Sequence, residues 1–348
     1  MLNNQERMEE IDREKMRDLL IKFPFHCEEA LRITKKQELF PNLFPKKRKI
    51  VICGMGGSGI GGEILKNLLR EENFSIFVNR GYTLPRSVDK EALVFAVSYS
   101  GNTEETLAAY KEAKKREVSL ISICSGGKLR EWSKRDGVPC FVIPPGMPPR
   151  TALGYLFIPM LRVLERWKWV KENSYEELFQ VLKRIKDSSA PSVPLEKNRA
   201  KIISSRLKGK IPLIYGVEGT TDVVAHRLKT QFNENSKTCA FWDVFPELNH
   251  NEVVSWEGKE NLDKFYFLFI RDKEEEERIK KRIEITQNIL KDKEAEWEEI
   301  WTEGKSLLTR IFSAIYLGDW VSFYLALLQR IDPTPVKMID LLKQKMEE

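Results

Sequence analysis

Two stretches of small and hydroxyl residues in the first third of the sequence could bind an anion. Residues 51–62 read Val-Ile-Cys-Gly-Met-Gly-Gly-Ser-Gly-Ile-Gly-Gly, and residues 98–103 read Ser-Tyr-Ser-Gly-Asn-Thr after an apolar run. An apolar strand that delivers such a loop to a helix offers backbone N–H groups and the positive end of the helix dipole. Because Ser98, Ser100 and Thr103 add three hydroxyls at one helix start, the two loops together predict a site for a small phosphorylated molecule.

Two familiar phosphate-binding motifs match the first loop only in part. Gly54 and Gly59 have the spacing of a Walker A loop, but Ile60 follows where that loop needs a lysine. Gly54, Gly56 and Gly59 also match the dinucleotide fingerprint, yet the next apolar run ends without the ribose-binding acid. Arg80 at that point keeps an NADP-dependent oxidoreductase as an alternative function.

Composition indicates a soluble, globular protein. The chain has 348 residues, a length that is enough for two domains with a buried core. Of these residues 42% are hydrophobic, and the formal net charge is +6. Lysine and glutamate are intermixed, so we expect no nucleic-acid surface. Five cysteines without a regular pattern favour a reducing compartment, and we expect the cytoplasm. We also expect no metal, no cofactor, and no apolar stretch of membrane-spanning length.

The elements that must position these loops alternate between strand and helix. This alternation predicts an α/β fold with two tandem, doubly wound parallel sheets. We expect N-terminal helices over 1–47, a first domain over 48–167, a helical linker over 168–193, a second domain over 194–330 and a C-terminal helix over 331–348. Within the second domain we expect a helix over 194–208, strands over 211–215, 237–242 and 265–270, and helices over 219–231, 274–291 and 306–329.

Several further motifs, taken in order, resemble one family. They are Pro149-Arg150-x-Ala-Leu, Asn233-Glu234-Asn235-x-Lys237, Pro246-Glu-Leu-Asn-His250-Asn-Glu, Leu317-Gly-Asp-Trp-Val-Ser-x-Tyr-Leu-Ala and Asp332-Pro-Thr-Pro. Together with the two loops, the chain from about residue 48 onward resembles the bifunctional phosphoglucose/phosphomannose isomerase family of sugar isomerase (SIS) proteins. The resemblance implies an aldose–ketose isomerase that converts glucose 6-phosphate, and mannose 6-phosphate, to fructose 6-phosphate through a cis-enediol(ate).

That chemistry needs a base, an acid/base for ring opening and a cation near the enediolate oxygens. The resemblance implies Glu234 as the base, since a buried carboxylate suits proton transfer. It implies His250 for ring opening, supplied by the neighbouring subunit of a homodimer, and Arg150 as the cation. Lys343 of the last helix is a further catalytic candidate, with Lys337 and Lys345 as alternatives.

The expected substrate contacts fall in the two loops and near the C-terminus. They are Gly56, Gly57, Ser58, Ser98, Ser100, Thr103 and Thr334. We expect the site at the carboxyl ends of the strands, between the two domains. A phosphosugar-binding SIS protein without catalysis is the other alternative function. We expect His26 and His226 to be structural, and Trp297 and Trp301 to pack at a sheet edge or an interface.

Overall fold

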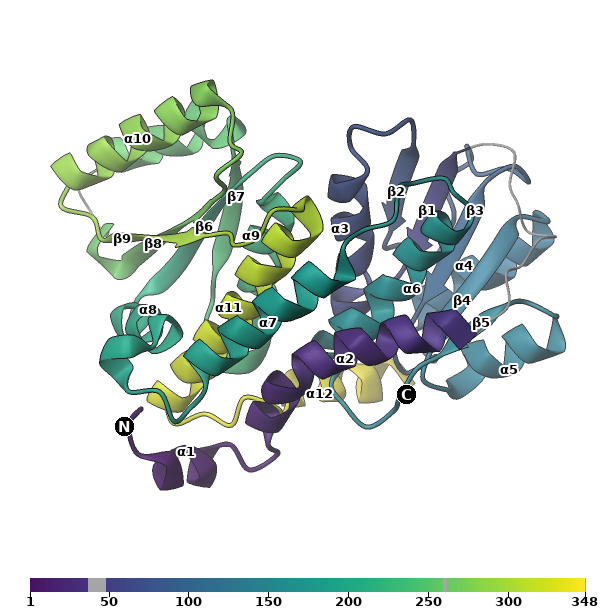
Figure 1. The fold of residues 1–348 in the computed structure, drawn as a ribbon, viewed down its shortest axis with the longest axis horizontal. Helices are drawn as coiled ribbons and strands as arrows, with labels where there is room; N and C mark the ends of the chain where they lie inside the picture. The colour runs from purple at the N-terminus through teal and green to yellow at the C-terminus, as the bar shows by residue number, and fades with distance from the viewer. Residues whose placement is uncertain (37–47, 259–261, 348) are drawn as a thin grey trace. The chain divides into compact units, whose positions relative to one another are not determined.

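The structure is a computed structural model that describes residues 1–36, 48–258 and 262–347. The chain forms two compact units, each built around one parallel sheet (Figure 1). The first-sheet unit comprises Lys22–Phe179. The second-sheet unit comprises Met1–Ile21 together with Gln180–Glu348. The predicted α/β class with two parallel sheets is confirmed.

The first-sheet unit has five parallel strands in the order β2-β1-β3-β4-β5. The strands are β1 (Lys49–Cys53), β2 (Ser75–Asn79), β3 (Leu93–Val97), β4 (Ser119–Cys124) and β5 (Cys140–Val142). The helices are α3 (Ile60–Leu68), α4 (Glu104–Lys115), α5 (Gly127–Arg135) and α6 (Leu153–Arg166). Two further helices have residues in both units: α2 (Met16–Lys36) and α7 (Tyr175–Ser189).

The order of these strands explains where the two predicted loops lie. From β1 the chain crosses to β2 on one side, and from β3 it proceeds to β4 and β5 on the other. Such a reversal between neighbouring parallel strands is where α/β proteins bind ligands, at the carboxyl ends. The loops over 54–59 and 98–103 directly follow β1 and β3. The predicted position of both loops at this edge is therefore confirmed.

The second-sheet unit has four parallel strands in the order β7-β6-β8-β9. The strands are β6 (Ile211–Val217), β7 (Phe241–Phe245), β8 (Phe265–Arg271) and β9 (Trp297–Trp301). The helices are α1 (Gln5–Ile11), α8 (Arg199–Leu207), α9 (Asp222–Gln231), α10 (Glu277–Asp292), α11 (Leu307–Leu328) and α12 (Lys337–Glu347). Helix α10 covers one face of the sheet, and α9 and α11 cover the other (Figure 1), as right-handed crossovers in opposite directions require.

Three sequence-based expectations need correction in this unit. The strand expected over 237–242 is β7, which begins only at Phe241 because residues 232–236 extend the preceding helix as a π turn. The helix expected over 194–208 is interrupted at Asn198, whose side chain accepts the N–H of Lys201 and begins α8. Helix α11 does reach membrane-spanning length, but 89% of its most apolar window is buried inside the protein.

The histidines expected to be structural make ring contacts. His26 is 5% exposed and packs on Tyr155, with ring centroids 5.3 Å apart. Burial lowers the pKa of His26 to about 4. His226 stacks on Trp242 at 4.8 Å. The two tryptophans of the 297–301 stretch form the ends of the edge strand β9, as the packing interpretation predicts.

Candidate functional site

The loop after β1 is a tight 3₁₀ turn over Gly56–Ser58. A Cβ at Gly57 would lie 2.8 Å from the carbonyl carbon of Pro149 and 2.9 Å from the backbone nitrogen of Arg150. Only glycine permits this approach, so the loop is in backbone contact with the short helix Pro149–Thr151. Arg150 is only 3% exposed. The backbone of Arg150 is therefore held against the first loop, and its side chain is buried.

The loop after β3 is organised by the hydroxyl of Ser98. Ser98 Oγ lies 2.8 Å from Thr103 Oγ1 and accepts the backbone N–H groups of Gly101, at 3.1 Å, and Thr103, at 3.4 Å. Ser98 is fully buried, whereas Ser100 is exposed. Ser100 Oγ accepts the N–H of Asn102 at 3.2 Å. Ser98 thus shapes the loop, and Ser100 is the serine hydroxyl that solvent reaches.

Tyr99 joins three segments at this edge of the sheet. Its N–H donates to Ser58 Oγ at 3.1 Å, which ties the second loop to the first. Its phenolic oxygen donates to the carbonyl of Pro144 and accepts the N–H of Met147, each at 3.0 Å. The two loops and the proline-rich segment before Arg150 therefore form one hydrogen-bonded frame. Backbone N–H groups and hydroxyls in such a frame suit a phosphate.

Glu234 lies on a π-helical turn, Phe232–Ser236, that continues α9. Such turns are rare and occur often at functional sites. The neighbouring Asn235 is buried, and its Nδ2 donates to Ser322 Oγ of α11 at 2.9 Å. Glu234 itself is half-buried, which is less than the burial we expected. The turn fixes the backbone while leaving the carboxylate accessible.

Lys237 ends this turn in a left-handed conformation with φ of 54°. Its Nζ donates to the carbonyl oxygens of Glu234, at 2.5 Å, and Asn235, at 3.4 Å. The same Nζ donates to the carbonyl oxygen of Pro333 at 3.2 Å. A cation at a helix C-terminus also complements the helix dipole. Lys237 therefore connects the turn that carries Glu234 to the segment before the last helix.

A cavity of about 650 Å³ lies between these two segments. Glu234 and Lys237 belong to one wall, and Asp332 and Lys337 belong to the other. Its remaining lining residues are Asn233, Thr238, Cys239, Ile331, Pro335, Val336, Met338 and Ile339.

The candidates near the C-terminus differ in their relation to this cavity. Thr334 lies within the segment that forms one wall, and its N–H donates to Asp332 Oδ1 at 3.1 Å. Of the three candidate lysines, Lys337 lines the cavity. Lys343 and Lys345 lie further along α12 and are exposed. The assignment of Lys343 to the site stays a prediction.

His250 ends a short 3₁₀ helix, Glu247–His250, that follows β7, and its side chain is exposed. The preceding Asn249 donates to Thr286 Oγ1 of α10 at 3.0 Å. His250 is thus carried on the α10 face of the sheet, after the carboxyl end of β7.

Glu234 and His250 do not lie together in one chain. The chain leaves the carboxyl edge at the end of β6, returns along α9 to the amino edge, and reaches Glu234 there before β7 begins. β7 then carries it back over about 13 Å, at about 3.3 Å per residue, to the segment of His250. The turn that carries Glu234 continues α9, and Asn249, which precedes His250, bonds to α10. Because α9 and α10 cover opposite faces of the sheet (Figure 1), the two segments lie on opposite faces. Our expectation of a site at strand carboxyl ends therefore does not hold for Glu234.

The segment after His250 is attached to the sheet by a carboxyl group that retains its proton near neutrality. Tyr215 of β6 donates its hydroxyl hydrogen bond to Glu252. Burial, and then the adjacent carboxylate of Asp243 on β7, raise the pKa of Glu252 to about 7.

Sequence reasoning missed the π turn and the role of Lys237. The spacing Asn-Glu-Asn-x-Lys carries a signal for both, because a lysine three residues after a glutamate at a helix end can reach the last carbonyls. In the described part of the chain, no cluster of three or more histidine, cysteine, aspartate or glutamate side chains could hold a metal ion.

Comparison with known families matches both units. Residues 43–129 match the SIS domain, and residues 196–346 match the bacterial phospho-glucose isomerase C-terminal SIS domain.

Two curated relatives cover most of the chain. It is 46% identical over 304 residues to the bifunctional phosphoglucose/phosphomannose isomerase of Caldicellulosiruptor bescii, covering 86% of this chain and 90% of the relative. It is 38% identical over 314 residues to the protein of the same description from Aquifex aeolicus, covering 90% and 94%. A solved structure of a hypothetical protein from Thermus thermophilus has the same fold, with a TM-score of 0.78, 16% identity, and 99% and 93% of the two chains covered.

Proposed function

Because the chain belongs to the bifunctional phosphoglucose/phosphomannose isomerase family, we propose that it interconverts glucose 6-phosphate and mannose 6-phosphate with fructose 6-phosphate. The enzyme is an intramolecular oxidoreductase: C2 is oxidised from alcohol to ketone while C1 is reduced from aldehyde to alcohol. The two aldose phosphates differ only in the configuration at C2. Since C2 loses its configuration in the enediol(ate), one site can process both.

Glu234 is the base of this proposal. It removes the proton from C2 of the open-chain aldose and returns a proton to C1, so no external reductant or oxidant is needed. The observation that carries the assignment is its position: a half-buried carboxylate in the wall of a cavity of about 650 Å³, on a turn held by Lys237. A fixed backbone keeps the carboxylate oriented during two proton transfers.

The phosphate group belongs in the frame formed by the two glycine and serine loops. Gly56, Gly57 and Ser58 lie in the first loop, and Ser100 and Thr103 present hydroxyls of the second at the start of α4. Ser98 contributes by holding Thr103 in place. Arg150 is the cation that stabilises the enediolate, since a buried, preorganised charge is most effective where negative charge develops.

His250 opens the sugar ring, because imidazole can both donate and accept a proton near neutral pH. Within one chain the turn of Glu234 follows α9, whereas the segment of His250 is bonded to α10 on the opposite face of the second sheet. One substrate therefore reaches both only if His250 comes from a second copy, and the enzyme is an obligate homodimer. Thr334 completes the substrate contacts, and Lys343 is a further catalytic residue of this proposal. The compartment is the cytoplasm.

A coupled assay tests this function directly. Fructose 6-phosphate formation is measured from glucose 6-phosphate and, separately, from mannose 6-phosphate, with EDTA present throughout. We expect product from both sugars. No product from either sugar contradicts the proposed function, and loss of activity on chelation with recovery on adding zinc contradicts the base mechanism.

A further inference from the structure

Helix α11 is buried along most of its length, yet two of its polar residues bond to the helix end that carries Glu234. They are Asp319, which is 3% exposed, and Ser322, which is fully buried, and both belong to the motif Leu317-Gly-Asp-Trp-Val-Ser. A buried polar group costs free energy unless it is hydrogen-bonded, and a buried charge costs more unless it is also paired. The partners of Asp319 and Ser322 therefore indicate which contacts this motif serves.

Asp319 holds the last turn of α9. Its Oδ2 accepts a hydrogen bond from Nη2 of Arg227, and its Oδ1 accepts one from Nε2 of Gln231, each at 2.8 Å. Both donors are buried, and they lie one helical turn apart on α9. Gln231 is the last residue of α9, directly before the π turn. One buried carboxylate thus fixes the end of α9 against α11.

Ser322 holds the π turn itself. Its hydroxyl donates to the backbone carbonyl oxygen of Asp319 at 2.8 Å. Because a hydroxyl has only one hydrogen, Ser322 Oγ acts as the acceptor for Nδ2 of Asn235, at 2.9 Å. Asn235 directly follows Glu234, and Gln231 precedes it by three residues. Helix α11 therefore bonds to the chain on both sides of the proposed base.

We propose that Asp319 and Ser322 are positioning residues for the isomerisation: they fix α9 and its π turn on α11 and so orient the carboxylate of Glu234. The inference rests on the proposed function, in which Glu234 moves a proton between C2 and C1. A misplacement of about 1 Å at a reacting group can lower a rate by about 10²-fold. Lys237 holds the end of the same turn, so the turn is attached both at its end and to α11.

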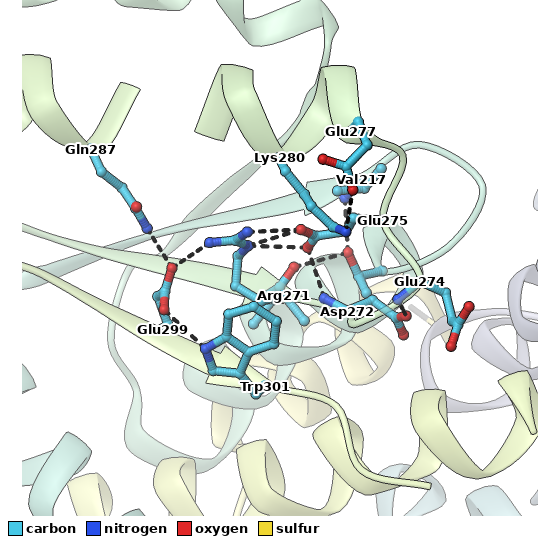
Figure 2. A network of polar contacts seen from close by, with 12 residues as sticks. Val217, Arg271, Asp272, Glu274, Glu275, Glu277, Lys280, Gln287, Glu299 and Trp301 are labelled. Carbon is cyan, nitrogen blue, oxygen red and sulfur yellow. Dashed lines mark hydrogen bonds and ion pairs between the residues drawn. The ribbon is translucent and has the colours of Figure 1, made fainter. Parts of the chain in front are cut away.

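The other end of α11 offers a matched control for Asp319. Asp272 is also 3% exposed, and it also accepts from one arginine and one neutral donor, Arg310 of α11 at 2.9 Å and Thr302 at 2.8 Å. It lies directly after β8, in the charge network that includes Glu275 (Figure 2). Its bonds join α11 to the carboxyl ends of β8 and β9 rather than to α9.

Ser313 is the matched control for Ser322. Each serine is buried in α11 and donates its hydroxyl to the carbonyl oxygen three residues earlier, Arg310 in the case of Ser313, at 2.6 Å. Each also accepts one N–H group, which for Ser313 is the backbone N–H of Glu303 at 2.7 Å. The two serines differ in that only the acceptor bond of Ser322 reaches the turn of Glu234.

Kinetics and thermal melts of four single variants test the proposal. Asp319→Asn and Ser322→Ala should each lower kcat by about tenfold and leave KM for the phosphosugar nearly unchanged. Asp272→Asn and Ser313→Ala should lower the melting temperature by amounts comparable to those of their counterparts and leave kcat unchanged. If Asp319→Asn does not fold, Ser322→Ala, which removes a single hydroxyl, carries the test. The same kcat in each variant and its control would overturn the positioning role.

A double variant separates positioning from a general loss of structure. In Glu234→Gln the base is already absent, so adding Ser322→Ala should lower the residual kcat no further, whereas it lowers that of wild type. An equal loss in both backgrounds overturns the inference and leaves the proposed function standing. If Glu234→Gln retains near-normal kcat, or if wild type is inactive toward both sugars, the proposed function fails and this inference fails with it.

Discussion

The two sheets of this protein present their functional residues in different ways. The first-sheet unit uses the carboxyl ends of adjacent strands and offers backbone N–H groups and hydroxyls, held by Ser58, Ser98 and Tyr99. The second-sheet unit offers a carboxylate on a π turn after a helix, held by Lys237. A phosphate is recognised by its position in a fixed frame, whereas proton transfer needs one oriented charged group. The first unit is therefore expected to govern substrate binding, and the second turnover.

The largest expected effect is on turnover, through Glu234. Glu234→Gln keeps the shape of the side chain and removes its basicity, so kcat should fall by about 10²–10⁴, the range for general acid–base catalysis. KM should change little, because the proposed phosphate contacts belong to the first-sheet unit. Steady-state kinetics with both sugars measure the two constants. Near-normal kcat would show that the base is a different residue.

The next effect should fall on binding. Ser100→Ala removes an exposed hydroxyl from the second loop, and the loss of one hydrogen bond to a charged phosphate costs roughly 1.5–3 kcal/mol. KM should rise by about tenfold or more, with kcat largely retained. Ser205→Ala, a helix-surface serine of the other unit, is a matched control. An unchanged KM in Ser100→Ala would remove this loop from the phosphate site.

A smaller effect is expected at Lys237, which we assign as a positioning residue. Lys237→Met removes two hydrogen bonds within the turn, to the carbonyl oxygens of Glu234 and Asn235, and the one hydrogen bond that ties the turn to Pro333. Without these three hydrogen bonds the carboxylate of Glu234 is less well oriented, which should lower kcat by about tenfold and leave KM for the phosphosugar nearly unchanged. Lys237→Arg should recover part of the lost turnover. A change in KM alone would assign Lys237 to substrate binding instead.

The smallest effect concerns the attachment of the His250 segment. The raised pKa of Glu252, about 7 against an ordinary value near 4.5, means that the folded state retains a proton that the unfolded state has lost. Stability should therefore fall as pH rises from about 4.5 to 7, by roughly 3 kcal/mol at most, and level off above 7. Thermal melts across this range should show the decline in wild type and a flatter profile in Glu252→Gln. Equal slopes for both proteins would contradict the retained proton.

Features that are encoded by residues close together in the sequence were predicted correctly, whereas features that depend on distant parts of the chain were not. The loops at 54–59 and 98–103 could be placed because a buried strand, a glycine or serine loop and a helix are all encoded within about fifteen residues. The turn at Glu234 is only partly encoded locally, since Lys237, which bonds to the turn, also bonds to Pro333, 96 residues away. The expected start of β7 was too early because the π turn, Phe232–Ser236, extends the preceding helix. The separation of Glu234 from His250 depends on strand order, which no local pattern contains.

One measurement tests most directly whether two copies share each site. Glu234→Gln and His250→Ala chains, each nearly inactive as homodimers, are co-expressed in equal amounts and purified together. If His250 acts on the partner's substrate, every mixed dimer contains one intact site with wild-type Glu234 and wild-type His250. Half of the dimers are then mixed, and the preparation should regain about a quarter of wild-type activity. Activity no higher than that of the separate variants would contradict the account, because it would place both residues in the same chain's site.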